Sequence, residues 1–141
     1  MDYESPTPTP SKAVLWISYI MSAIPVLMLF MSAAMKIAKV PMVTEGFTKM
    51  GFPAGVIMPI GIVELVCTVI YIIPQTAVLG AILLTGYLGG AIVTHVRAEE
   101  AFIGPLAFGV LIWGGLFLRD ARIRALIPLR KAVNEYKGFL H

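Results

Sequence analysis

Residues 56–73 read VIMPIGIVELVCTVIYII, an apolar run that contains a single carboxylate, Glu64, near its middle. As an α-helix, a run of this length crosses the roughly 30 Å hydrocarbon core of a membrane. A charged carboxylate at that depth costs free energy unless it is neutral, paired or hydrated. The run therefore predicts a buried helix whose one acid needs a partner or has a function.

The composition of the whole chain points to the same class of protein. Of its 141 residues 58% are hydrophobic and only 13% are charged, and the mean hydropathy is +0.86. A soluble domain of this size could not bury so much apolar surface. The single cysteine, Cys67, lies inside the apolar run, which excludes a disulfide within one chain. The composition thus predicts one compact membrane domain.

Four apolar segments predict an all-α fold, an integral membrane four-helix transmembrane bundle. Only Pro74, Gln75 and their neighbours separate the second segment from the third, so these two should form an antiparallel hairpin. The longer connection between the first and second segments, residues 36–53, has amphipathic character and predicts an interfacial segment or a short helix. The four segments run over about residues 13–35, 54–73, 76–96 and 102–118.

Both ends of the chain differ from this membrane domain, which we expect over residues 13–118. Residues 1–12 form a proline-rich tail, and residues 119–141 form a basic tail. An even number of spans puts both termini on one side, with seven basic residues against four on the other. The positive-inside rule then predicts cytoplasmic termini in a bacterial inner membrane. No basic and aromatic domain supports binding of nucleic acid.

Several polar residues of the second and third segments could surround Glu64. Thr68 and Tyr71 follow it one and two turns along the same helical face. Across the hairpin, Thr85 and Tyr87 lie near its level. One interpretation is a neutral Glu64 that is hydrogen-bonded to such a partner and holds two helices together. The other is a pocket used for proton transfer, quinone contact or ligand binding.

Lys36 ends the first segment and His95 nearly ends the third, so both should lie at the outer face of the membrane. Each could be an ordinary interfacial side chain. Alternatively, both line one cavity with Glu64. Lysine is long enough to reach Glu64, whereas His95 lies roughly 15 Å, or about ten residues, beyond the level of Thr85.

A small-residue motif, Gly86 and Gly90, lies in the third segment. A GxxxG pair lets helices approach closely. We expect it to pack helices within the bundle, and a contact with a second copy is the alternative.

The sequence contains no motif for a metal, a nucleotide or a covalent nucleophile. Its two histidines and one cysteine do not make a zinc or haem site. GxGxxG, Walker, CxxC and nucleophile-elbow motifs are missing. No cofactor is therefore identified, and an isolated chain is not expected to be an enzyme. Electron transfer would require a diffusible quinone or the cofactor of a partner.

The order of these motifs resembles the DoxX-like family of small bacterial membrane proteins, over about residues 13–118. The resemblance rests on Ser32-Ala33-Ala34-Met35-Lys36, Gly51-Phe52-Pro53, Gly61-Ile62-Val63-Glu64-Leu65, Pro74 and Gly89-Gly90-Ala91-Ile92-Val93-Thr94-His95. It implies a four-helix transmembrane bundle with shared polar positions at Lys36, Glu64 and His95. The founding relative is a small subunit of an archaeal thiosulfate:quinone oxidoreductase. Other relatives are linked to oxidative-stress complexes, and more distant ones are membrane chaperones. Because this chain has no thiol pair, we do not extend thiosulfate chemistry to it.

Three functional hypotheses follow. The first is an accessory subunit of a quinone-linked redox complex or another membrane complex, with a polar site around Glu64. The second is a non-catalytic scaffold or assembly factor. The third is a membrane protein that binds a small molecule or lipid. All three place the chain in the lipid bilayer, the first two predict other membrane subunits as partners, and a homo-oligomer is left open.

Overall fold

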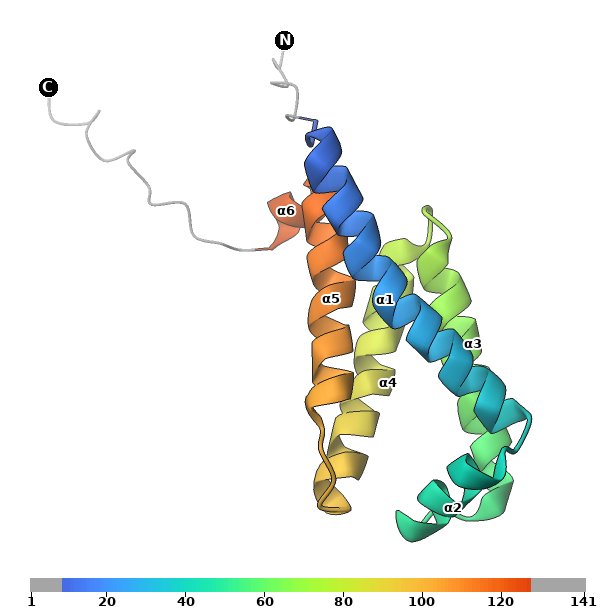
Figure 1. Cartoon of the computed structure of the whole chain (residues 1–141). Helices are drawn as coiled ribbons and strands as arrows, with labels where there is room; N and C mark the ends of the chain where they lie inside the picture. The colour runs from blue at the N-terminus through green and yellow to red at the C-terminus, as the bar shows by residue number, and fades with distance from the viewer. Residues whose placement is uncertain (1–8, 128–141) are drawn as a thin grey trace, which may run out of the picture.

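The computed structural model describes residues 9–127, and every regular element in this range is helical (Figure 1). The predicted tails extend beyond it at both ends, so residues 1–8 and 128–141 lie outside the described residues. The elements are α1 (Lys12–Ile37), α2 (Pro41–Lys49), the 3₁₀ turn η1 (Ala54–Val56), α3 (Ile57–Ile72), α4 (Ala77–Arg97), α5 (Ile103–Arg119) and α6 (Ala121–Leu126).

The long helices confirm the all-helical membrane class. Three of them, α1, the continuous η1–α3 unit and α4, are long and apolar enough to cross a membrane. The fourth, α5, is also apolar but has only 17 residues. The predicted segments coincide with these helices to within two residues at each end. The expected short helix in the first connection is also present, as α2.

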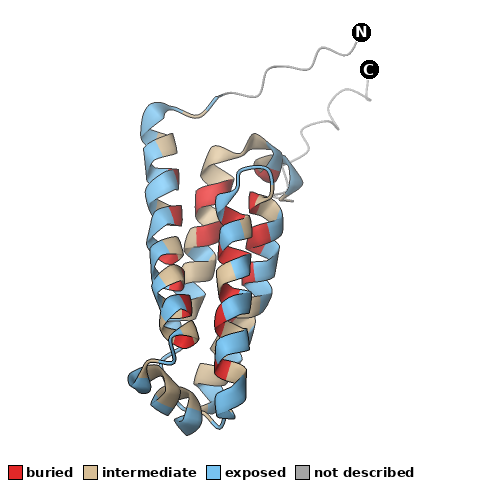
Figure 2. Cartoon of the chain, turned by 90° about the vertical axis from the view of Figure 1, so that its right-hand side faces the viewer, coloured by how far each residue is buried: buried red, intermediate tan, exposed pale blue. Residues whose placement is uncertain are grey.

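The four long helices pack in a ring. Helix α1 contacts α3 and α5, and α4 contacts the same two helices, so α1 and α4 occupy opposite corners. Buried residues lie on the helix faces that turn toward one another, whereas the outward faces are exposed (Figure 2). Many of the exposed residues are large and hydrophobic. This arrangement suits a lipid environment. The core comprises Leu29, Cys67, Tyr71, Ala77, Ala81, Leu84, Leu88, Ile112 and Leu116.

Helix α2 lies across the end of the bundle that is away from the start of α1 and from α6 (Figure 1). It begins at Pro41, whose fixed φ suits the first turn of a helix. Left-handed residues bracket it: Lys39, with φ 53°, follows α1, and Gly51, with φ 83°, follows α2. At each of these residues, two backbone N–H groups donate to carbonyls in the last turns of the preceding helix, and these bonds end that helix. The second turn brings Phe52 back against Phe47, with ring centroids 5.4 Å apart.

Three glycines lie close to the backbone of a neighbouring helix. A Cβ atom on Gly61 of α3 would lie 2.8 Å from the Cβ of Lys36 on α1. One on Gly80 would meet the backbone of Tyr71, and one on Gly115 would meet Ser22. Only glycine lets α1–α3, α3–α4 and α1–α5 pack at these separations.

Gly86 and Gly90 do not take part in this packing. A Cβ atom at either position would meet no other heavy atom within 4 Å. Both line a pocket instead. The prediction that they pack helices within the bundle is therefore wrong, because a GxxxG pair marks a small-residue face but does not specify what faces it. Contact with a second copy stays a prediction.

Candidate functional site

A buried ion pair joins Lys36, in the last turn of α1, to Glu64, in the middle of α3. Lys36 Nζ lies 2.7 Å from Glu64 Oε2, and the two residues are only 8% and 1% exposed. Lys36 also donates a hydrogen bond to Ser32, whose hydroxyl donates to Glu64 Oε2 over 3.4 Å. Pairing leaves no net charge in the interior and lowers the cost of burying either group. Of the partners that the sequence left open for Glu64, the structure contains Lys36.

The local sequence makes this pair possible. Ser32 precedes Lys36 by one helical turn and therefore shares its face. Gly61 lies nearly one turn before Glu64 and lets α3 approach the backbone of α1 beside Lys36. Lys36 is therefore turned into the bundle and is not a snorkelling side chain at its surface.

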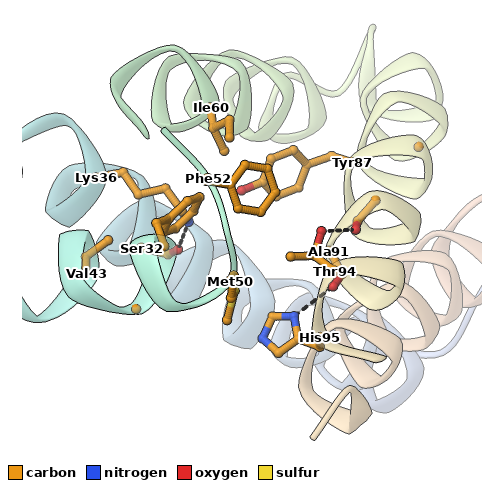
Figure 3. Close-up of a pocket in the computed structure, with 14 residues that line it drawn as sticks. Ser32, Lys36, Val43, Met50, Phe52, Ile60, Tyr87, Ala91, Thr94 and His95 are labelled. Carbon is orange, nitrogen blue, oxygen red and sulfur yellow. Dashed lines mark hydrogen bonds between the residues drawn. The ribbon is translucent and has the colours of Figure 1, made fainter. Parts of the chain in front are cut away.

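A pocket of about 620 Å³ lies beside this pair, between α1, α2, α3 and α4 (Figure 3). Lys36 and His95 both line it, so the structure brings these two predicted residues to one cavity. Glu64, the ion-pair partner of Lys36, does not line the pocket itself. The lining residues are Ser32, Lys36, Val43, Gly46, Phe47, Met50, Phe52, Ile60, Gly86, Tyr87, Gly90, Ala91, Thr94 and His95.

Helix α2 and the turn after it supply an aromatic wall. Lys36 Nζ lies 5.8 Å from the centroid of the Phe47 ring, a cation–π contact. Phe52 packs on Phe47 and extends toward Tyr87 in Figure 3. The sequence reasoning missed Ser32, Phe47 and Phe52. The spacing of Ser32 and Lys36 was the available signal for the first, whereas the two rings reach the site only because α2 folds back.

The opposite wall belongs to α4 and carries Tyr87 and His95. His95 Nδ1 donates to the main-chain oxygen of Ala91 over 2.7 Å. In the neutral imidazole this bond leaves Nε2 as an acceptor. Tyr87 lines the pocket from the same helix. The absence of side chains at Gly86 and Gly90 keeps this wall open.

The other predicted site residues lie outside the pocket. Thr68 is buried on the same face of α3 as Glu64, and its hydroxyl donates to the main-chain oxygen of Glu64 over 2.7 Å. Tyr71 is also on that face, but its hydroxyl lies 2.7 Å from Ser22 Oγ and donates to the Ile112 carbonyl. The expected polar stripe exists, although only its Glu64 end adjoins the pocket.

Thr85 does not bond Glu64 either. Its hydroxyl donates to the Ala81 carbonyl and accepts a hydrogen bond from Trp113 Nε1. The side-chain hydrogen bonds of Glu64 within residues 9–127 come from α1, from Lys36 and Ser32. The structure therefore does not contain a hydrogen bond between Glu64 and Thr85 across the hairpin.

The pocket combines apolar walls with a few convergent polar groups: an ammonium, a phenol and an imidazole. Such a site can hold an apolar molecule and hydrogen-bond its polar end. Between residues 9 and 127, no three side chains among His, Cys, Asp and Glu lie together as a metal shell would require.

Comparison with known proteins identifies the family. No curated protein and no solved structure matches the chain. The model of the DoxX-like family matches residues 20–115, a range that contains Ser32, Lys36, Glu64, Tyr87 and His95. This range covers most of the four long helices and all the residues that line the pocket. The chain is therefore a membrane protein that belongs to the DoxX-like family.

Proposed function

We propose that this protein binds a quinone in the pocket beside Lys36 and Glu64, and that it serves as an accessory subunit of a quinone-linked membrane complex. The observation that carries the proposal is the pocket itself, whose wall includes one member of a buried ion pair. Its volume of about 620 Å³ falls in the range of small-molecule sites.

The lining chemistry matches the parts of a quinone. A quinone has carbonyl oxygens that accept hydrogen bonds, a flat ring and an apolar tail. Lys36 and Tyr87 supply donors in the lining of the pocket, and Phe47 and Phe52 offer faces on which a ring can stack. Glu64 balances the charge of Lys36, so the ammonium can donate to a carbonyl without burying a net charge.

The accessory role follows from what the pocket offers. Its polar groups can bind and orient the head of a quinone and exchange protons with it. Electrons would pass between the quinone and the cofactor of a partner subunit. In this role Lys36 and Glu64 hold the head of the quinone, whereas the apolar outer faces of the bundle contact lipid or partner helices.

The membrane topology belongs to the same proposal. With α5 as a fourth span, both termini share one side, and we assign that side to the cytoplasm of a bacterial inner membrane. Burial of Lys36 supports the assignment, because it removes this lysine from the loop charges of the opposite side. Reporter fusions at the two termini test it, and a periplasmic signal from either end would contradict it.

A binding titration tests the function. The full chain in lipid nanodiscs is titrated with a short-tailed ubiquinone and a short-tailed menaquinone. We expect saturable binding that weakens roughly tenfold or more in Lys36→Met, because a hydrogen bond from a charged donor is worth about 1.5–3 kcal/mol. Lys39→Met is the matched control, since Lys39 is exposed and does not line the pocket.

The scaffold and assembly-factor hypothesis gives a different result. It predicts no saturable binding of either quinone by the wild-type protein, together with co-purification of a larger membrane complex that survives Lys36→Met. That combination would contradict the proposal. Binding of another small molecule in place of both quinones would favour the more general ligand-binding hypothesis.

A further inference from the structure

A second cavity, of about 510 Å³, lies at the other end of the bundle from the quinone pocket. It is enclosed by the first half of α1, the turn between α3 and α4, and the end of α5. Most of its lining is apolar, with one cation, Arg119, and one carboxylate, Asp120. The lining residues are Leu15, Tyr19, Ser22, Ala23, Val26, Tyr71, Ile72, Pro74, Ala77, Leu116, Arg119 and Asp120.

Arg119 is held in a fixed position at this cavity. Its Nη1 atom donates to Ser22 Oγ over 2.6 Å and to the Ser18 carbonyl over 3.5 Å. The guanidinium carbon lies 5.7 Å from the centroid of the Tyr19 ring and 5.8 Å from that of Tyr71. The two rings and two hydrogen bonds limit the freedom of a side chain that would otherwise extend to the membrane surface.

These contacts use only part of the hydrogen-bonding capacity of Arg119. A guanidinium has five N–H donors, and both of its hydrogen bonds within residues 9–127 come from Nη1. The Nε and Nη2 atoms donate no hydrogen bond within residues 9–127, and Arg119 lines the cavity, so these atoms can donate to a ligand there. Together they form the flat edge that pairs with two oxygens of a phosphate or carboxylate.

Asp120 also lines the cavity, but within residues 9–127 its carboxylate forms no ion pair with Arg119. Its carboxylate accepts a hydrogen bond from the backbone N–H of Arg122 over 2.9 Å and so caps the start of α6. Arg124 donates to the carbonyls at the end of α5. Residues 119–124 therefore carry three arginines and one aspartate, so this segment has a net positive charge.

We propose that this cavity binds the phosphate headgroup of an anionic membrane lipid. The Nε–Nη2 edge of Arg119 pairs with the phosphate oxygens, and the acyl chain lies along the apolar wall that includes Leu15, Val26 and Ile72. Free phosphate shares the anionic chemistry, but it would leave that apolar wall uncovered. Pockets between membrane helices that contain basic residues are a known kind of lipid headgroup site. The proposal does not depend on what occupies the quinone pocket.

Lipid retention tests this site. The full chain is exchanged into detergent containing equal amounts of phosphatidylglycerol and phosphatidylcholine, and retained lipid is counted by native mass spectrometry. We expect phosphatidylglycerol to exceed phosphatidylcholine about tenfold in the wild type. Arg119→Gln should remove most of this preference, about one decade of affinity, because the lost positive charge is what favours a net negative headgroup over phosphatidylcholine, whose phosphate is balanced by its choline. The matched control, Arg122→Gln, makes the same charge change at an exposed residue and should retain the preference within about twofold.

A second variant protects the test against loss of folding, since Arg119 also joins α5 to α1. Ala23→Phe fills the cavity and leaves Arg119 in place, and it should also lose phosphatidylglycerol. Added inorganic phosphate should not displace the lipid. Equal retention of both lipids by the wild type, a full preference in folded Ala23→Phe, or displacement by inorganic phosphate would each overturn the proposal.

Discussion

The ammonium of Lys36 and the carboxylate of Glu64 lie 2.7 Å apart inside the bundle, and Lys36 also lines the pocket while Glu64 does not. One side chain therefore connects the packing of α1 on α3 with the surface that a ligand would contact. Changes that disturb the pair should alter both the stability of the bundle and the binding of a ligand.

The first prediction concerns the pair itself. Lys36→Met leaves Glu64 buried without its cation and should lower the free energy of unfolding by about 3 kcal/mol. The double variant Lys36→Met/Glu64→Leu removes both charges and should recover most of that loss. Denaturant titration in mixed micelles measures both values. A double variant no more stable than the single one would show that the pair is not the reason for the loss.

The second prediction concerns the close approach at Gly61. In Gly61→Ala the new Cβ would lie 2.8 Å from the Cβ of Lys36, so α1 and α3 must move apart. We expect a loss of about 1–3 kcal/mol in stability and weaker quinone binding, because Lys36 moves with α1. Gly89→Ala is the control, since its Cβ meets open space and alanine favours helix by about 1 kcal/mol. Equal effects of the two variants would contradict the role of Gly61.

The third prediction separates the two tyrosines. Tyr71→Phe removes a hydroxyl that contacts Ser22 and Ile112, and it should cost about 1–2 kcal/mol of stability. Quinone affinity should stay within about twofold of the wild type, because Tyr71 does not line that pocket. Tyr87→Phe should do the reverse and weaken quinone binding several-fold with little change in stability. Thermal unfolding and quinone titration of the two variants distinguish these roles.

The fourth prediction concerns the turn that positions α2. Lys39 has a φ of 53°, a conformation that costs a residue with a Cβ about 1–2 kcal/mol. Glycine adopts it freely but loses about 0.5–1 kcal/mol of entropy on folding, so Lys39→Gly should raise the free energy of unfolding by about 0.5–1 kcal/mol. Gly51→Ala, at φ 83°, should lower it. A loss of stability in Lys39→Gly would contradict this reading of the turn.

Much of the fold could be predicted because the apolar segments are long and end in turn residues such as Pro74. The Lys36–Glu64 pair was predictable for a similar reason, since a buried acid needs a counter-charge and lysine can reach it. The aromatic wall was not predictable, because it depends on how two left-handed residues, Lys39 and Gly51, turn α2 back over the bundle.

Other features were misread because they depend on tertiary packing. Gly86 and Gly90 have the spacing of a packing motif, yet isolated Gly61 and Gly80 make the close contacts. Tyr71 shares a face with Glu64 but belongs to the Ser22–Arg119 cluster at the far end of the bundle. Periodicity along one helix gives the face of a residue, but it does not indicate which neighbour lies opposite.

Photo-crosslinking tests the central claim, that the pocket beside Lys36 and Glu64 binds a quinone, most directly. The full chain in nanodiscs is labelled with an azidoquinone, and the modified peptides are mapped by mass spectrometry. We predict labels on residues 43–52 and 87–95, which face each other across the pocket, suppressed by excess unlabelled quinone and reduced in Lys36→Met. Labels confined to the lipid-facing surface, or labelling that unlabelled quinone does not suppress, would contradict the claim.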